Sequence, residues 1–124
     1  FVPVRGFMTG SIDLIFEHEG RWYVVDYKSN HLGEHPADYI PSKLDKAMCH
    51  GHYVLQYHIY CVALHRFLRW RFGDGYSFED HFGGAIYLFV RGMAPDHVVG
   101  TGIFRDAPTQ ELIEGMSRLF GGSP

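Results

Sequence analysis

The sequence predicts an α/β domain in which helices pack against a sheet. At 124 residues the chain is one domain at most. Residues 10–16 and 22–28 are rich in β-branched and aromatic side chains and flank a short turn, as is typical of a β-hairpin. Residues 84–90 form a continuous apolar run, as expected of a central strand that is buried on both faces. Residues 53–71 have the pattern of a helix with a wide apolar surface, which should be mostly buried against the sheet.

Each strand of the predicted hairpin carries a carboxylate within its apolar run. Asp13 interrupts the first strand and Asp26 interrupts the second, and the turn between the strands is His18-Glu19-Gly20. An ionised carboxylate in such a strand is costly unless a cation or hydrogen bonds compensate it. Two carboxylates on paired strands therefore suggest a shared cation.

The spacing of Asp26 and Lys28 supports a catalytic interpretation. Side chains alternate between the two faces of a strand, so these two point the same way, roughly 7 Å apart along the strand. Carboxylate oxygens suit Mg²⁺, a bound metal can activate water, and a lysine can steady the water or the developing negative charge. These residue types predict metal-assisted phosphodiester hydrolysis.

A loop and a helix should follow the hairpin. Residues 31–41 contain glycine and proline and should lie at the rim of the site, either as a DNA-facing element or as a solvated connector. The capping-box pattern Ser42-Lys43-Leu44-Asp45 should start a helix that ends near His50. Gly51 should break or kink it before the longer helix begins.

The longer helix, residues 53–71, carries its apolar side chains on adjoining rows. These are Leu55, Ile59 and Val62, and Tyr57, Cys61, Leu64 and Leu68. A mainly polar row consists of Val54, His58, His65 and Arg69. Arg66, Arg69 and Arg71 lie near its end, where cations suit the helix dipole, and they could also meet DNA or a neighbouring domain.

The remaining segments predict a loop, a strand, a loop, a short strand and a helix. Residues 72–80 should form the first loop, and residues 101–104 the short strand after the apolar run. Thr109 should cap the last helix. The apolar stripe of this helix has a 3.6-residue period and comprises Leu112, Ile113, Met116, Leu119 and Phe120.

Composition limits the classes of function. The net charge of −3 gives no global basic signal for nucleic acid, although a local basic face is compatible with it. Cys49 and Cys61 are expected to be reduced, buried thiols, which fits a cytoplasmic location. The nine histidines show no recognisable zinc spacing, and no apolar run reaches transmembrane length. Because the chain does not begin with Met, we expect it to be a fragment of a larger protein.

Five segments occur in an order that resembles a known family. They are Gly10-Ser11-Ile12-Asp13-Leu14, Val25-Asp26-Tyr27-Lys28-Ser29-Asn30, Leu55-Gln56-Tyr57-His58-Ile59-Tyr60, Ala63-Leu64-His65-Arg66 and His81-Phe82-Gly83-Gly84-Ala85-Ile86-Tyr87-Leu88-Phe89-Val90-Arg91-Gly92. Together they resemble the RecB-like C-terminal nuclease domain of exodeoxyribonuclease V beta subunits, in the PD-(D/E)xK nuclease superfamily. The resemblance implies a single nuclease domain over residues 1–124. Its catalytic core would span about 6–92, and a C-terminal strand and helix would span about 100–121.

The resemblance also implies the fold and the metal site. The fold would be restriction-endonuclease-like and α+β-like, with a central mixed sheet flanked by helices and the N-terminal helical part of the domain missing. Asp13, Asp26 and the backbone carbonyl of Tyr27 would bind Mg²⁺, for which Mn²⁺ can substitute, and Lys28 would be the catalytic lysine. Relatives carry a further ligand, usually histidine, upstream of the first Asp. The residues before Asp13 include no His or Glu, so we expect weak metal binding and an isolated fragment of doubtful activity.

Gln56 and Tyr60 lie one turn apart on the long helix and match the Q-x-x-x-Y pattern of RecB-like nucleases. The residues alone favour an ordinary core Gln and Tyr. The resemblance favours side chains beside the active site that support the lysine or a DNA phosphate.

The resemblance implies a role for the whole protein as well. It would be a helicase and exonuclease that uses ATP in a part outside this chain, joins RecC and RecD, and processes DNA double-strand breaks for recombinational repair in the bacterial cytoplasm. The alternative is an inactive domain of the same fold that binds DNA or a partner subunit. Such domains typically lose the carboxylates or the lysine, and this chain retains all three. An unrelated α/β domain with a simple Asp26–Lys28 ion pair is a third interpretation, and the extent of the matched segments argues against it.

Overall fold

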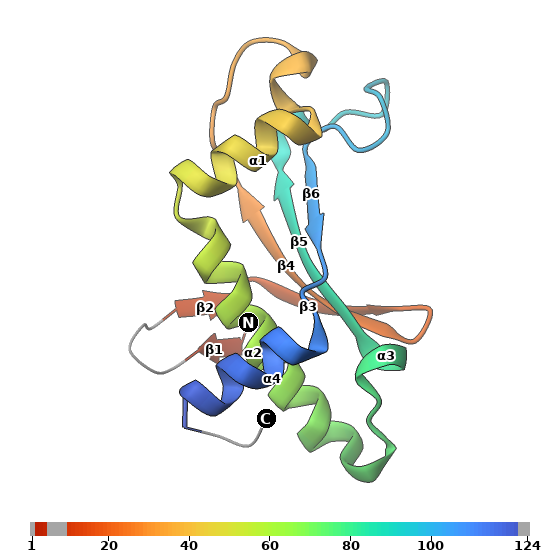
Figure 1. The fold of residues 1–124 in the computed structure, drawn as a ribbon. Coiled ribbons are helices and arrows are strands. Elements are labelled where there is room, and N and C mark those ends of the chain that lie inside the picture. The colour runs from red at the N-terminus through yellow and green to blue at the C-terminus, as the bar shows by residue number, and fades with distance from the viewer. Residues whose placement is uncertain (1, 5–9, 122–124) are drawn as a thin grey trace.

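The computed structural model describes residues 2–4 and 10–121, which form two sheets and a layer of helices (Figure 1). The strands are β1 (Val2–Val4), β2 (Gly10–Ile12), β3 (Leu14–His18), β4 (Arg21–Lys28), β5 (Phe82–Phe89) and β6 (Ile103–Asp106). The α-helices are α1 (Pro41–His50), α2 (Tyr53–Phe72), α3 (Phe78–His81) and α4 (Gln110–Leu119). Short 3-10 turns are η1 (Pro36–Tyr39), η2 (Gly73–Gly75) and η3 (Val90–Gly92). The predicted start of the family resemblance, near residue 6, lies outside the described residues.

The predicted hairpin is confirmed, with one change in its first strand. β3 and β4 pair antiparallel from Leu14 opposite Val25 to His18 opposite Arg21, around the turn Glu19-Gly20. The segment 10–16 is interrupted at Asp13, and the part before it, β2, pairs with β1 in a separate two-stranded sheet. Asp13 therefore lies at the point where the chain passes from one sheet to the other.

The larger sheet has the order β3-β4-β5-β6 and is mixed. β4 and β5 run parallel at its centre, whereas β3 and β6 are antiparallel to their neighbours. This arrangement confirms the predicted central mixed sheet with flanking helices. Because β4 and β5 are parallel, their carboxyl ends lie at the same edge, which is also where Lys28 lies.

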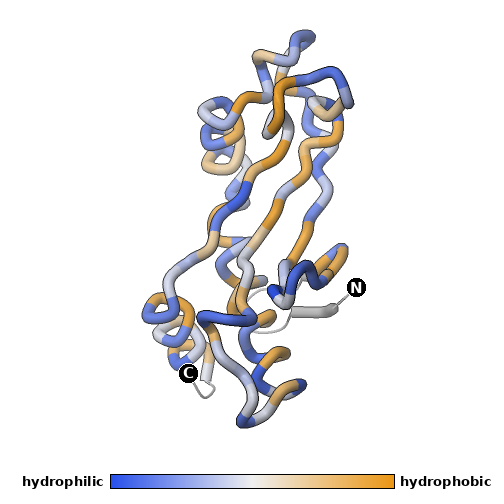
Figure 2. The backbone as a smooth tube through the Cα atoms, turned by 90° about the vertical axis from the view of Figure 1, so that its right-hand side faces the viewer, coloured by the Kyte–Doolittle hydropathy of each residue, from blue (hydrophilic) through white to orange (hydrophobic). Residues whose placement is uncertain are grey.

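Helices α1 and α2 cover one face of this sheet, and the apolar core lies between them and the strands. Tyr87 and Phe89 of β5 and Val24 of β4 are fully buried there, together with Leu64 and Leu68 of α2. In Figure 2 the long strands of the sheet carry hydrophobic stretches that are interrupted by paler and hydrophilic residues, and the helices carry hydrophobic stretches as well. The alternate strand residues point to the other face, where they line an open groove of about 540 Å³. Its lining is Leu14, Phe16, His18, Tyr23, Val25, Tyr27, Ile86, Leu88, Ile103 and Arg105. Ile86 and Leu88 are only partly buried, so the prediction that β5 is buried on both faces holds for one face.

Several predicted boundaries need correction. Helix α1 begins at Pro41, with Ile40 as its N-cap and no side-chain cap, so the capping box at Ser42 is not used. Proline at the first helical position needs no N–H partner and competes successfully with that pattern. Helix α3 occupies part of the predicted 72–80 loop, because the Ser77 side chain accepts a hydrogen bond from the Asp80 N–H and caps it.

The break between α1 and α2 lies where the sequence predicts it, but burial differs from the prediction at two positions of α2 and at one position of α1. α1 stops at His50, and α2 covers residues 53–72. Leu55 is 53% exposed although it belongs to a predicted apolar row. His65 is buried instead, with its Nδ1 2.8 Å from the Tyr76 hydroxyl. Cys61 is buried as a free thiol, whereas the thiol of Cys49 is exposed, contrary to prediction.

The C-terminal strand and helix are present, with a shifted strand. β6 covers residues 103–106, and Thr109 caps α4 as predicted by accepting a hydrogen bond from the Leu112 N–H. The face of α4 that is fully buried contains Ile113 and Ser117, whereas Leu119 is 81% exposed. Arg66 of α2 donates hydrogen bonds to the Ser117 hydroxyl and carbonyl, which joins the two helices. Within residues 2–4 and 10–121, no helix is both long and apolar enough to cross a membrane.

Candidate active site

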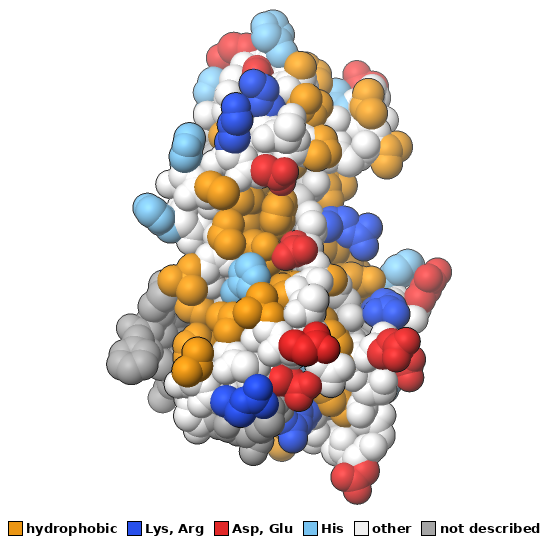
Figure 3. Space-filling model, in the orientation of Figure 1, with side chains coloured by type: hydrophobic (Ala, Val, Ile, Leu, Met, Phe, Trp, Pro, Cys, Tyr) orange, Lys and Arg blue, Asp and Glu red, His pale blue; other side chains and the backbone are white. Residues whose placement is uncertain are grey.

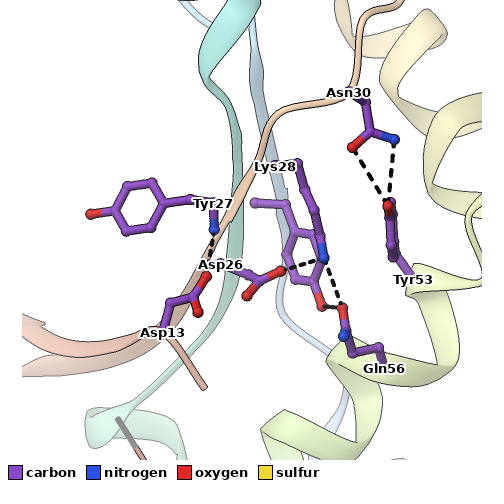
Figure 4. Close-up of polar contacts among 8 residues, drawn as sticks. Asp13, Asp26, Tyr27, Lys28, Asn30, Tyr53 and Gln56 are labelled. Carbon is purple, nitrogen blue, oxygen red and sulfur yellow. Dashed lines mark hydrogen bonds and ion pairs between the residues drawn. The ribbon is translucent and has the colours of Figure 1, made fainter. Parts of the chain in front are cut away.

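The carboxyl end of β4 places Asp26 and Lys28 on the face that α2 covers (Figure 4). As the strand alternation predicts, the two side chains are neighbours, and Lys28 Nζ lies 2.6 Å from Asp26 Oδ2. Asp26 is 5% exposed as a residue, and the side chain of Lys28 is 14% exposed. A buried carboxylate of this kind needs a cationic partner, which Lys28 supplies.

Asp13 approaches Asp26 from the bend between β2 and β3. Because Leu14 pairs with Val25, Asp13 lies beside the next residues of β4, and its Oδ2 accepts a hydrogen bond of 3.0 Å from the Tyr27 N–H. Its carboxyl group is also close enough to Asp26 to share a hydrogen bond. Asp13, Asp26 and the Tyr27 peptide group therefore meet at one point, whereas coordination through the Tyr27 carbonyl stays a prediction.

The two carboxyl groups have opposite pKa shifts. Burial, and then the Asp13 carboxyl group, raise the pKa of Asp26 from 3.8 to about 6, although Lys28 lowers it. The hydrogen bond with Asp26 and the Tyr27 N–H lower the pKa of Asp13. Near neutral pH both carboxyl groups are therefore ionised, and their negative charges lie close together at a largely buried place. Such perturbed, interacting carboxyl groups are typical of functional sites.

Gln56 and Tyr60 of α2 lie next to the lysine. Gln56 Oε1 accepts a hydrogen bond of 2.7 Å from the Tyr87 hydroxyl and a longer one of 3.4 Å from Lys28 Nζ. The Tyr60 hydroxyl shares a hydrogen bond with the Gln56 side chain, and burial together with the charge of Asp26 raises the pKa of Tyr60. The residues predicted for the site thus form one connected group, and their individual roles stay predictions.

Three residues at the site were missed by the sequence reasoning. The ring of Tyr53 lies 4.0 Å from Lys28 Nζ, the ring of Tyr87 lies 5.3 Å from it, and Asn30 makes hydrogen bonds with the Tyr53 hydroxyl. Helical spacing could have found Tyr53, because residues 53, 56 and 60 recur on one face. Tyr87 could have been found as well, because the hydroxyl group of a tyrosine buried in a central strand usually has a hydrogen-bond partner.

The donor set fits a divalent cation. Asp13 and Asp26 offer carboxylate oxygens, the ligand type that Mg²⁺ and Mn²⁺ prefer, and a cation would offset their mutual repulsion. Across residues 2–4 and 10–121, no three His, Cys, Asp or Glu side chains come together as a metal site. A metal held here would therefore depend on backbone oxygen, water or a ligand from elsewhere, and the weak affinity that we expect stays a prediction.

Two of the three arginines near the end of α2 have structural contacts. Arg66 binds Ser117, and the guanidinium group of Arg71 lies 5.2 Å from the centre of the Trp22 ring. On the face shown in Figure 3, Lys and Arg side chains are scattered among acidic ones. This face therefore gives no support for a broad basic surface.

Comparison with known proteins identifies the family. Residues 2–118 match the family described as the PD-(D/E)XK nuclease superfamily. The chain is 48% identical over 122 residues to the RecBCD enzyme subunit RecB of Escherichia coli, which covers 98% of this chain and 10% of that protein. The corresponding protein of Haemophilus influenzae is 46% identical over 120 residues, covering 97% of this chain and 10% of that protein. The Mycobacterium tuberculosis protein (strain H37Rv) is 46% identical over 123 residues, covering 94% and 11%.

The chain thus spans about one tenth of the length of these curated relatives. The resemblance to RecB-like nuclease domains that the sequence predicts is confirmed by these identities. The family match covers nearly the whole chain and includes the hairpin, α2 and β5, on which the candidate site lies. The chain belongs to the PD-(D/E)XK nuclease superfamily.

Proposed function

We propose that this chain hydrolyses phosphodiester bonds of DNA with the help of a divalent metal ion, as the nuclease domain of a RecBCD-type helicase and nuclease. The observation that supports this most directly is the contact between Asp13, Asp26 and Lys28 at the end of β4. A member of this superfamily that had lost catalysis would be expected to lack one of these side chains.

Each residue has a distinct proposed role. Asp13, Asp26 and the Tyr27 carbonyl would hold Mg²⁺, for which Mn²⁺ can substitute. Such an ion supplies Lewis acidity and an activated water when it is bound. Lys28 would place its positive charge beside the scissile phosphate and stabilise the negative charge that develops there. Gln56 would orient the ammonium group of Lys28, and Tyr60 would support Gln56.

The proposed role of the whole protein is supported by the names of its relatives. Three of them are named as RecB subunits of the RecBCD enzyme. We infer that the protein acts with RecC and RecD on DNA ends, as an exonuclease in double-strand break repair by recombination. ATP would serve a helicase part outside this chain, and the location would be the cytoplasm. The second candidate is an inactive domain that binds DNA or a partner subunit. One observation favours it: among the described residues only two carboxylates meet at the site.

Calorimetric titration with Mn²⁺ tests the metal site on which this function depends. We expect the protein to bind Mn²⁺ at pH 7.5 and Asp26→Ala to bind it at least about tenfold more weakly, because an anionic oxygen ligand is lost. Asp74→Ala, which removes an exposed carboxylate on η2, is the matched control and should bind as the wild type does. Equal binding by wild type and Asp26→Ala would refute the site. Absence of binding by both, in the protein with its upstream residues, would favour the inactive domain.

Metal binding should also depend on pH in a defined direction. The cation binds ionised carboxylates, and the pKa of Asp26 is raised to about 6, so a proton competes for this oxygen below that value. Mn²⁺ affinity should therefore be nearly constant above about pH 7 and fall by up to about tenfold per pH unit below pH 6. The weaker Mn²⁺ binding that remains in Asp26→Asn should not show this fall in affinity below pH 6. A flat profile down to pH 5 in the wild type would contradict the assignment.

A further inference from the structure

The ammonium group of Lys28 lies against the aromatic face of Tyr53. Its Nζ is 4.0 Å from the centre of that ring, closer than its 5.3 Å distance to the ring of Tyr87. The face of an aromatic ring carries partial negative charge and attracts a cation, more strongly where water is excluded. Since the Lys28 side chain is only 14% exposed, this attraction acts in a largely desolvated position.

Tyr53 is itself tied to the strand that carries the lysine. Its hydroxyl group lies 3.4 Å from Asn30 Nδ2 and 3.5 Å from Asn30 Oδ1, and Asn30 follows Lys28 by two residues (Figure 4). The Tyr53 ring also packs near Tyr87, with the ring centres 6.1 Å apart. The ring is therefore held at its polar end by the continuation of β4 and along its side by β5.

The junction between α1 and α2 is shaped around this ring. A Cβ atom at Gly51 would lie 2.5 Å from Cε2 of Tyr53, so a larger residue there would displace the ring. His52, the N-cap of α2, adopts a left-handed conformation with φ of 59° and has no side-chain capping bond. Such a conformation is unfavourable for a residue other than glycine and persists where the surroundings impose it. The junction thus leaves room for the ring of Tyr53, the first residue of α2, which lies over Lys28 Nζ.

We propose that Tyr53 is a positioning residue for Lys28, a role that rests on the proposed nuclease function. Lysine has a flexible four-carbon side chain, and its hydrogen bond to Gln56 is long at 3.4 Å. The aromatic face of Tyr53 packs against the ammonium group and holds it beside Asp26. Tyr53 acts through Lys28 and does not need to touch DNA.

Steady-state cleavage of DNA by the protein that carries this chain tests the proposal. Tyr53→Leu should lower kcat roughly tenfold with little change in KM, because the cation–π attraction is lost and DNA contacts are kept. Tyr53→Phe keeps the ring face and should stay within about threefold of wild type. Trp70→Leu, on the same helix and 80% exposed in the wild type, should cleave normally.

The decisive comparison uses a double variant. If Tyr53 acts through Lys28, Tyr53→Leu should cause no further loss of kcat in a Lys28→Gln background. Asn30→Ala removes the hydrogen bonds to the Tyr53 hydroxyl but leaves the Tyr53 ring in the protein. It should lower kcat by roughly threefold in the wild type and should have no effect in the Lys28→Gln background. It serves as the second variant if Tyr53→Leu fails to fold. Equal losses in both backgrounds, or normal cleavage by Tyr53→Leu, would overturn the proposal. If Lys28→Gln alone cleaved normally, the proposed role of Lys28 would fail first.

Discussion

Asp26→Asn should reduce DNA cleavage by the protein that carries this chain by about a thousandfold or more. The change keeps the shape of the side chain but removes the negative charge that would hold the metal and that pairs with Lys28 at 2.6 Å. Metal-assisted charge stabilisation contributes several kcal/mol to such reactions, and each 1.4 kcal/mol corresponds to about a factor of ten in rate. The measurement is the initial rate of release of nucleotides from linear duplex DNA at saturating Mg²⁺.

The same variant should keep ATP-dependent unwinding, because we place the helicase part outside this chain. Unwinding therefore reports whether the protein is assembled and folded. Asp74→Asn, an exposed carboxylate at the far end of α2, should leave both activities unchanged. Cleavage within tenfold of wild type by Asp26→Asn would refute the metal-site assignment. Loss of unwinding together with cleavage would show a folding defect instead, and Asp13→Asn would then take its place as the test.

The local geometry of this site follows from periodicity, so it could be predicted. A strand repeats every two residues, which puts Asp26 and Lys28 side by side, and a helix brings residues four apart onto one face, which puts Gln56 near Tyr60. The hairpin, the central strand and the break at Gly51 are likewise local patterns. The family resemblance then adds that the hairpin and the helix face each other.

The parts that escaped prediction depend on distant contacts or on competition between local signals. Helical spacing places Tyr53 on the face of Gln56 and Tyr60, but its contact with Lys28 spans 25 residues of sequence, and nothing near Lys28 indicates that this ring will cover the ammonium group. The strand break at Asp13 depends on pairing with β1. A helix that is apolar on most sides does not reveal which row faces solvent, so the exposure of Leu55 depends on how α2 sits on the sheet. At the start of α1, the proline signal and the capping box compete, and proline prevails.

Lys28→Gln should lower the rate of DNA cleavage by roughly a hundredfold to a thousandfold while metal binding persists. The loss of one preorganised group that stabilises developing negative charge typically has an effect of this size. Glutamine can still donate a hydrogen bond but carries no charge. Single-turnover cleavage of linear DNA with Mg²⁺ measures the chemical step. Lys43→Gln, an exposed lysine on α1, is the matched control and should cleave normally.

Mn²⁺ titration separates a catalytic lysine from a structural one. Lys28 lowers the pKa of Asp26, so its removal strengthens proton competition, and the titration belongs at pH 8, where Asp26 should be ionised in both proteins. Lys28 Nζ also forms an ion pair with Asp26 Oδ2, an oxygen that a metal could use. Because Lys28→Gln removes this competing cation, its affinity for Mn²⁺ should stay within about threefold of wild type or become tighter. A parallel loss of affinity and rate would mean that Lys28 serves to keep Asp26 in place. Unchanged affinity with a slow chemical step would assign its charge to the reacting phosphate.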